Sequence, residues 1–267
     1  MAQQKGRFET FLISLAVFAT GAVFAVIAMD VLAPYRRGRE HPETTTLRAR
    51  FGPSKVSANA EEWAIRDFFA DQRGGVFVDV GSSDYRENSN TYYLETTLGW
   101  SGLAIDPLKA FEADYLKFRP RTKFRSFFVS DRSDSDTTVY VLDNNSLVTS
   151  SDKSFTLRHG KNVSELKAPT ITLNELLTKE GISKFDFMSM DIELSEPKAL
   201  AGFDIERFRP RLVCIEAHLE VRQQILDFFA RHNYTVVGKY LRADSENLYF
   251  MPLEAPQSGA PSKQPGN

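Results

Sequence analysis

Apolar and polar positions along residues 59–253 follow two spacings, and each spacing predicts one kind of element. Short runs of β-branched, aromatic and other apolar residues predict strands, whereas apolar residues three and four positions apart predict amphipathic helices. Strands are expected at 76–80, 103–105, 124–129, 137–142, 185–190, 212–215, 235–240 and 248–251. Helices are expected at 60–72, 91–98, 110–118, 173–179, 197–201 and 221–232.

Because these helices and strands alternate, residues 59–253 are expected to form an α/β three-layer sandwich around a mostly parallel sheet. The last two strands are joined by the short turn 242–246, and a connection of this length demands an antiparallel pair. Residues 143–168 are polar and rich in turn formers. We expect them to form a long loop or hairpin over one end of the sheet.

Residues 11–29 show a different pattern, an apolar run of 19 residues without a charge. A helix rises about 1.5 Å per residue, so the run approaches the roughly 30 Å of bilayer hydrocarbon, and we expect one transmembrane helix over 11–33. A cleaved signal peptide is the alternative, but the run exceeds the usual apolar region of about 7–15 residues and lacks a clear cleavage motif. More basic residues follow the run than precede it, which favours a single-pass membrane protein with its C-terminal domain in the cytoplasm.

The remaining segments of the chain are polar. Residues 1–10 flank the apolar run, and residues 34–58, with two prolines, have the composition of a linker. Residues 254–267 are rich in Pro, Gly, Ser and Gln, which predicts a disordered tail. The chemistry of the protein is therefore expected within residues 59–253.

Composition narrows the classes of function. The net charge is −2, so the chain as a whole has no excess of positive charge that would attract nucleic acid. The single cysteine, Cys214, lies in a strand pattern and is interpreted as a buried hydrophobe, which excludes a disulfide framework. The four histidines are scattered without the spacing of a zinc site. We expect no metal to be required, although clustered aspartates could bind Mg²⁺.

Acidic residues recur where the predicted strands end. Asp79, Asp106, Asp131 and Asp191 all lie at or beside the carboxyl ends of successive strands. Each alone could serve a turn or cap a helix. An open parallel sheet binds its ligand at this edge, however, and the recurrence there favours a ligand site.

The turn after the first strand indicates which ligand this is. Residues 81–86 read Gly-Ser-Ser-Asp-Tyr-Arg, which lacks the glycines of a G-x-G-x-x-G fingerprint and places an acid, Asp84, where a pyrophosphate would lie. No Walker A lysine is present either. Asp106 follows Gly81 by 25 residues, at the position where a nucleotide-binding fold holds ribose hydroxyls. A ligand with ribose and adenine but no phosphate fits best, and S-adenosylmethionine is such a ligand.

Two stretches resemble a known family. They are VDVGSSDYRENSNTYYLETTLGWSGLAIDP, from residue 78, and FDFMSMDIELSEPKALAGFD, from residue 185. They are similar to the FkbM-type S-adenosylmethionine-dependent methyltransferases, and the resemblance extends over about residues 61–253. It implies a class I methyltransferase (Rossmann-like) fold, with a seven-stranded sheet whose last strand is antiparallel. It also implies methyl transfer mainly to oxygen, on sugars and natural-product hydroxyls.

The resemblance also implies which residues bind the cofactor. The methionine side of S-adenosylmethionine would lie beside Asp79, Gly81, Ser82 and Ser83. The ribose would bind Asp106, and the adenine would be flanked by Ser130 and Asp131.

The catalytic candidates are Asp191, Glu193 and His218. The resemblance places Asp191 and Glu193 at the methyl group and the acceptor, and Asp191 is the first choice as general base. His218 is an alternative base because its ordinary pKa is about 6.5, although capping the next helix explains it equally well. Two residues depart from the family pattern, since Tyr85 and Leu194 stand where glycines are usual. Tyr85 is expected to narrow the mouth of the pocket or to touch the acceptor.

Two other functions remain open. A membrane-tethered binding module could keep the fold without the chemistry, and a nicotinamide-dependent oxidoreductase is the enzyme alternative. The expected partner is a small-molecule or glycan acceptor, including a lipid-linked one, because of the membrane helix. The sequence does not determine the oligomeric state.

Overall fold

The computed structural model describes residues 41–143 and 145–253. The expected transmembrane helix over 11–33, its flank and the tail 254–267 lie outside the described residues. Within the described residues, no helix combines the length and the hydrophobicity that a membrane span requires.

Part of the segment interpreted as a linker, 34–58, is helical. Helix α2 (Pro42–Phe51) begins with a proline at its first position, the His41 side chain caps it, and it ends before Gly52, whose φ is +89°. Its one buried side chain, Leu47, packs with Trp63 of helix α3 (Glu61–Phe69). A helix with a single buried residue shows no apolar stripe, so the hydrophobic pattern did not reveal it.

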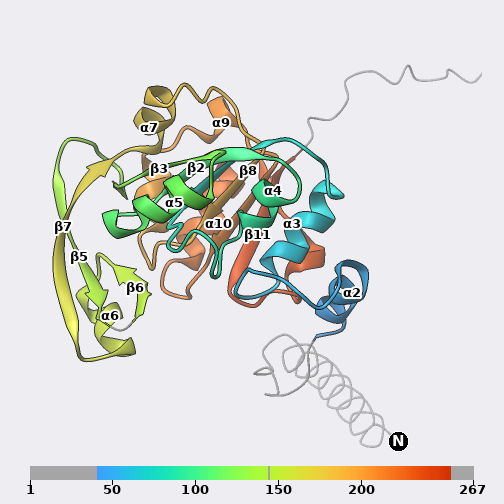
Figure 1. Cartoon of the computed structure of the whole chain (residues 1–267), viewed down its shortest axis with the longest axis horizontal. Helices are drawn as coiled ribbons and strands as arrows, with labels where there is room; N and C mark the ends of the chain where they lie inside the picture. The colour runs from blue at the N-terminus through green and yellow to red at the C-terminus, as the bar shows by residue number, and fades with distance from the viewer. Residues whose placement is uncertain (1–40, 144, 254–267) are drawn as a thin grey trace, which may run out of the picture. The chain divides into compact units, whose positions relative to one another are not determined.

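A seven-stranded sheet forms the centre of the molecule, in the order β10-β11-β9-β8-β1-β2-β3 (Figure 1). Only β11 runs antiparallel to its neighbours, which confirms the predicted sheet and its antiparallel last strand. The strands are β1 (Val76–Val80), β2 (Ser101–Ile105), β3 (Thr122–Arg125), β8 (Phe187–Met190), β9 (Leu212–Glu216), β10 (Tyr234–Val236) and β11 (Asn247–Pro252).

Helices cover both faces of this sheet, as the predicted three-layer sandwich requires. Along β1, Phe77 packs towards α3 and α4, and its neighbour Val78 packs towards α7 to α10, because successive strand residues face opposite sides. The helices of the first face are α3, α4 (Tyr92–Thr96) and α5 (Glu112–Phe118), which follows the short helix η1 (Lys109–Phe111). Those of the second face are α7 (Leu173–Lys179), α8 (Glu196–Ala201), α9 (Ile205–Phe208) and α10 (Arg222–Arg231). A second short helix, η2 (Gly238–Tyr240), precedes β11.

A second, four-stranded sheet, which we call the accessory sheet, has the order β4-β7-β5-β6. In Figure 1 its strands β5, β6 and β7 stand with α6 to one side of the central sheet. Its elements are β4 (Phe128–Val129), β5 (Asp136–Leu142), β6 (Asn145–Ser150), α6 (Lys153–His159) and β7 (Val163–Ile171).

The accessory sheet corrects two predictions. The strand expected at 124–129 divides, so that β3 belongs to the central sheet and β4 to the accessory sheet. The long loop or hairpin expected at 143–168 instead contains β6, α6 and most of β7. Most side chains of β7 are exposed, so the strand carries polar residues on both faces and its sequence has the composition of a loop.

Candidate active site

A cavity of about 230 Å³ opens at the carboxyl ends of β1, β2 and β8. This is the edge where the acidic residues were predicted to meet, between the adjacent strands β1 and β8 where the strand order reverses. The predicted site residues that line this first cavity are Asp79, Gly81, Ser82, Ser83, Asp106, Asp191 and Glu193.

The turn after β1 brings backbone close to the cavity. Gly81 has φ +81° and donates its N–H to the carbonyl of Ile105 at 2.8 Å. A Cβ at this position would lie 1.7 Å from the backbone oxygen of Asp191, so only glycine lets the ends of β1 and β8 close together. The Oγ atoms of Ser82 and Ser83 are buried in the same turn without hydrogen-bond partners. They remain available to a ligand in the cavity.

Asp106 holds this turn from the end of β2. Its two carboxylate oxygens accept the backbone N–H of Ser83 at 3.1 Å and of Leu108 at 2.8 Å. Burial raises the pKa of Asp106 to about 6, and the negative charge of Asp79 adds to the effect. Each carboxylate oxygen has a second lone pair, so the group can still accept hydrogen bonds from a ligand.

Asp79 lies on the same face as α4 and is almost fully buried. It accepts a hydrogen bond from the Oγ1 of Thr91 at 2.7 Å. Burial raises its pKa to about 6, and the Thr91 hydrogen bond and the positive charge of Arg119 oppose that rise. Asp79 therefore joins the cavity to a polar network beneath it.

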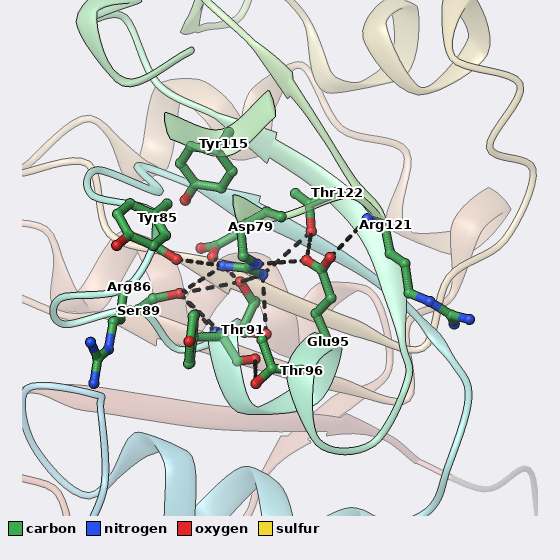
Figure 2. Close-up of polar contacts among 12 residues, drawn as sticks. Asp79, Tyr85, Arg86, Ser89, Thr91, Glu95, Thr96, Tyr115, Arg121 and Thr122 are labelled. Carbon is green, nitrogen blue, oxygen red and sulfur yellow. Dashed lines mark hydrogen bonds and ion pairs between the residues drawn. The ribbon is translucent and has the colours of Figure 1, made fainter. Parts of the chain in front are cut away.

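The centre of that network is Arg119, which sequence analysis missed. Figure 2 shows the surrounding contacts, with Thr91 between Asp79 and Glu95. The guanidinium is fully buried and contacts Glu95 at 2.5 Å, the Thr91 hydroxyl at 3.1 Å and the Tyr85 carbonyl at 2.8 Å. It ties α4 and the loop 82–91 to the end of α5. Nothing in the sequence separates a buried arginine from a surface one, so no signal could have found it.

The predicted adenine residues lie outside the cavity lining. Ser130 is buried, donates its Oγ to Asp131 at 3.0 Å and pairs its backbone with Ile171, while Asp131 is exposed. The wall on this side is the preceding segment 127–129, which presents Phe127, Phe128 and Val129. An apolar wall suits the flat face of a heterocycle better than a hydroxyl and a carboxylate do.

His218 lies between two carboxylates at the edge of the cavity. Its Nε2 is 3.1 Å from Glu193 and 3.0 Å from Glu216. The interaction with Glu216 is the main cause that raises the pKa of His218 to about 9, so the imidazole is a cation at neutral pH. Burial raises the pKa of Glu193 to about 7, and the charge of Asp191 adds to this. The three groups offer ligand atoms within 4.8 Å of one another, the one such set in residues 41–143 and 145–253, and could hold a divalent metal.

Asp191 is more exposed than the neighbouring Glu193 and Glu216. The residue Asp191 is exposed and lines the cavity, whereas Glu193 and Glu216 are partly covered and face His218. The surrounding protein nevertheless raises the pKa of Asp191 by desolvation, and the negative charge of Glu216 raises it further. A carboxylate with a raised pKa that lines a cavity suits proton transfer.

Comparison with known proteins identifies the family. The family model described as the methyltransferase FkbM domain matches residues 79–236. The chain belongs to the FkbM methyltransferase family. No curated protein sequence matches it.

Several solved methyltransferases are similar to this FkbM family member. One is a TehB-like SAM-dependent methyltransferase from Corynebacterium glutamicum, 15% identical with a TM-score of 0.42, over 78% of this chain and 94% of that one. Another is an O-methyltransferase from Bacillus cereus in complex with SAH, 12% identical with a TM-score of 0.39, over 85% of this chain and 96% of that one. A third is a SAM-dependent methyltransferase from Geobacter sulfurreducens with S-adenosyl-L-homocysteine, 13% identical with a TM-score of 0.36, over 77% and 79%.

The two departures from the FkbM pattern have different structural outcomes. The expectation that Tyr85 narrows the pocket mouth is wrong, because its ring stacks on Phe118 at 4.7 Å and it does not line the first cavity. Leu194 has φ +73° and follows Glu193 at φ +53°. A leucine in this left-handed region is strained where a glycine would not be, and its side chain packs against the core.

The raised pKa values predict how the stability of this FkbM methyltransferase depends on pH. Asp79 and Asp106 have pKa values of about 6, Glu61 and Glu193 of about 7, and His218 of about 9, all above their ordinary values. Each such group stabilises the fold below its ordinary pKa, and that stability is lost as pH rises through the folded-state pKa. The ligand-free protein should therefore lose stability as the pH rises from about 5 to about 9. The melting temperature should fall by at least ~2–4 °C, the change that 1 kcal/mol produces in a domain of this size. Calorimetry across this range checks it, and a constant or rising melting temperature would contradict it.

Proposed function

We propose that the protein is an S-adenosylmethionine-dependent methyltransferase that methylates a hydroxyl of a sugar, glycolipid or natural-product acceptor. The observation that carries the proposal is the first cavity of an FkbM family member, where Asp106, the Gly81 turn and Asp191 meet at one sheet edge. Bound S-adenosylmethionine would supply an activated methyl group on its sulfonium. The remaining chemistry is to hold that group, align the hydroxyl and take up its proton.

The residues of the cavity fit this cofactor. Ser82, Ser83 and Asn90 each leave a buried side-chain oxygen without a partner, which a polar amino-acid moiety can satisfy. Asp106 offers free lone pairs to ribose hydroxyls, and the wall 127–129 offers apolar surface to adenine. Among residues 41–143 and 145–253, no lysine or arginine lines the first cavity, which favours a ligand without phosphate.

Asp191 is the proposed general base. It is exposed in the first cavity, and its raised pKa lets it hold the proton that the acceptor hydroxyl releases. Glu193 and Glu216 face the His218 cation, which opposes the rise in their pKa values that burial causes. These two glutamates instead set the charge around Asp191, and the negative charge of Glu216 raises the pKa of Asp191.

The ribose role of Asp106 gives a binding prediction. Asp106→Ala should weaken S-adenosylhomocysteine binding by about 10- to 100-fold, since a hydrogen bond to a charged group contributes about 1.5–3 kcal/mol. Isothermal titration calorimetry measures this directly. Asp131→Ala is the matched control, because Asp131 is exposed and outside the lining, and it should bind normally. Equal affinities of the two variants would remove Asp106 from the ribose site.

The alternative functions are separated by simple measurements. Binding of NAD in preference to S-adenosylmethionine would indicate the oxidoreductase. Binding of S-adenosylmethionine without transfer of labelled methyl groups to any fraction of a cell-envelope extract would indicate an inactive binding module.

We also propose that residues 11–33 anchor the protein as a single-pass membrane protein with the catalytic domain in the cytoplasm. Membrane fractionation with protease protection tests that arrangement.

A further inference from the structure

A second cavity, of about 530 Å³, adjoins the first. It lies between α6 of the accessory sheet and the segment from the end of β9 to the start of α10. Three glutamates, Glu193, Glu216 and Glu246, line both cavities and so mark their junction. A molecule in the second cavity would therefore reach the carboxylates beside the proposed methyl-transfer site.

The accessory sheet forms one wall of the second cavity and contacts the junction directly. Phe155 of α6 is buried and packs its ring edge-on against His218, with ring centroids 5.1 Å apart. Ser150, at the end of β6, donates its hydroxyl to the carbonyl of Glu193 at 2.6 Å. The sheet therefore positions the residues that a bound molecule would meet.

Acidic and basic residues line different parts of the second cavity. The charged residues at the junction are acids, whereas the ionisable residues that line only the second cavity are the bases His159, His218 and Arg222. The guanidinium of Arg222 forms no ion pair with any residue in the described part of the chain. His218 is already held by Glu193 and Glu216, so Arg222 is the free cation that the described residues place at this cavity.

We propose that the second cavity binds the methyl acceptor and selects a hydroxyl compound that also carries an anionic group. The hydroxyl would extend past the junction into the first cavity, where Asp191 lies, and the phosphate or carboxylate of the acceptor would pair with Arg222. An arginine fork matches either anion in bidentate geometry. The inference rests on the proposed function, which makes the ligand a methyl acceptor. The cavity and its charged residues do not depend on that function.

The histidines allow a direct binding test. The chain has four, of which His159 and His218 line the second cavity and His41 and His232 do not. Imidazole NMR signals would be followed while the S-adenosylhomocysteine-bound protein is titrated with glucose, glucose 6-phosphate or glucuronate. We expect the two anionic probes to shift the signals of His159 and His218 alone, and glucose to bind at least about tenfold more weakly.

Matched variants on helix α10 complete the test. Arg222→Gln should weaken binding of the anionic probes by at least about tenfold, while Arg231→Gln, the same change outside this cavity, should leave it unchanged. Equal binding of glucose and the anions, or anion binding that survives Arg222→Gln, would overturn the proposal. Calorimetry of S-adenosylhomocysteine binding to Arg222→Gln keeps the two proposals apart. Normal cofactor affinity together with lost anion binding supports both, whereas absent cofactor affinity in the unaltered protein would refute only the proposed function.

Discussion

Replacing Arg119 by methionine is expected to lower the free energy of unfolding by about 3–5 kcal/mol, the usual effect of breaking a buried ion pair. The substitution leaves the Glu95 carboxylate buried without its cation. It also removes the donors to the Thr91 hydroxyl and the Tyr85 carbonyl, on which the loop beside the first cavity depends. Urea unfolding followed by circular dichroism measures the loss.

Two further variants separate the charge effect from simple side-chain loss. Arg121→Met changes an exposed arginine two positions away and should alter stability by less than about 0.5 kcal/mol. The double variant Arg119→Met with Glu95→Leu should recover much of the lost stability, because no charge then stays buried alone. If the single and double variants are equally unstable, packing of the Arg119 side chain is what matters, and the ion-pair explanation fails.

Replacing Asp191 by asparagine is expected to lower kcat by about 10²- to 10⁴-fold, the usual contribution of a general base. Asparagine keeps the shape and the backbone contacts of the β8 end but cannot accept the proton. Cofactor affinity, measured alongside by calorimetry, should change little. Transfer of labelled methyl groups into an acceptor-containing envelope fraction gives the rate, and Asp227→Asn on the exposed side of α10 is the matched control.

The pH profile tests the same role of Asp191. A base must be deprotonated, so the rate of the unaltered enzyme should rise with pH through the raised pKa of Asp191. That acidic limb should disappear in Asp191→Asn. Unchanged turnover in the variant, or the same limb in both proteins, would exclude Asp191 as the base and favour Glu193, whose pKa is about 7.

The parts of the site that follow local rules could be predicted from the sequence. Gly81 and Asp106 lie where apolar strand patterns end, and the ends of parallel strands share one edge of the sheet. Asp191 followed from the end of a third such strand, whereas Glu193 was implied by the family resemblance. These positions need no knowledge of distant contacts, because the periodicity of the strands and the order of the elements determine where they lie.

What depends on contacts between distant segments could not be predicted. Arg119 is buried only because Glu95 and Thr91, about 25 residues earlier, fold against it. The grouping of His218 between Glu193 and Glu216 likewise arises from the pairing of β8 with β9. In the accessory sheet the strand at 137–142 was predicted, but β6 and β7 were not, because these exposed strands bury too little apolar surface to leave a pattern.

The way the accessory sheet joins the core has a consequence for protein engineering. Its first strand, β4, pairs with the end of its last, β7, and Ser135 and Thr170 bond through their hydroxyls at 2.7 Å. The chain thus leaves the core and returns to it at nearly the same place. A segment with adjacent ends can be exchanged without disturbing the fold that carries it. Residues 135–170 therefore form a segment whose exchange would leave the central sheet in place. Ser146, Leu147 and Thr149 of the first cavity, and Phe155 and His159 of the second, would be exchanged with it.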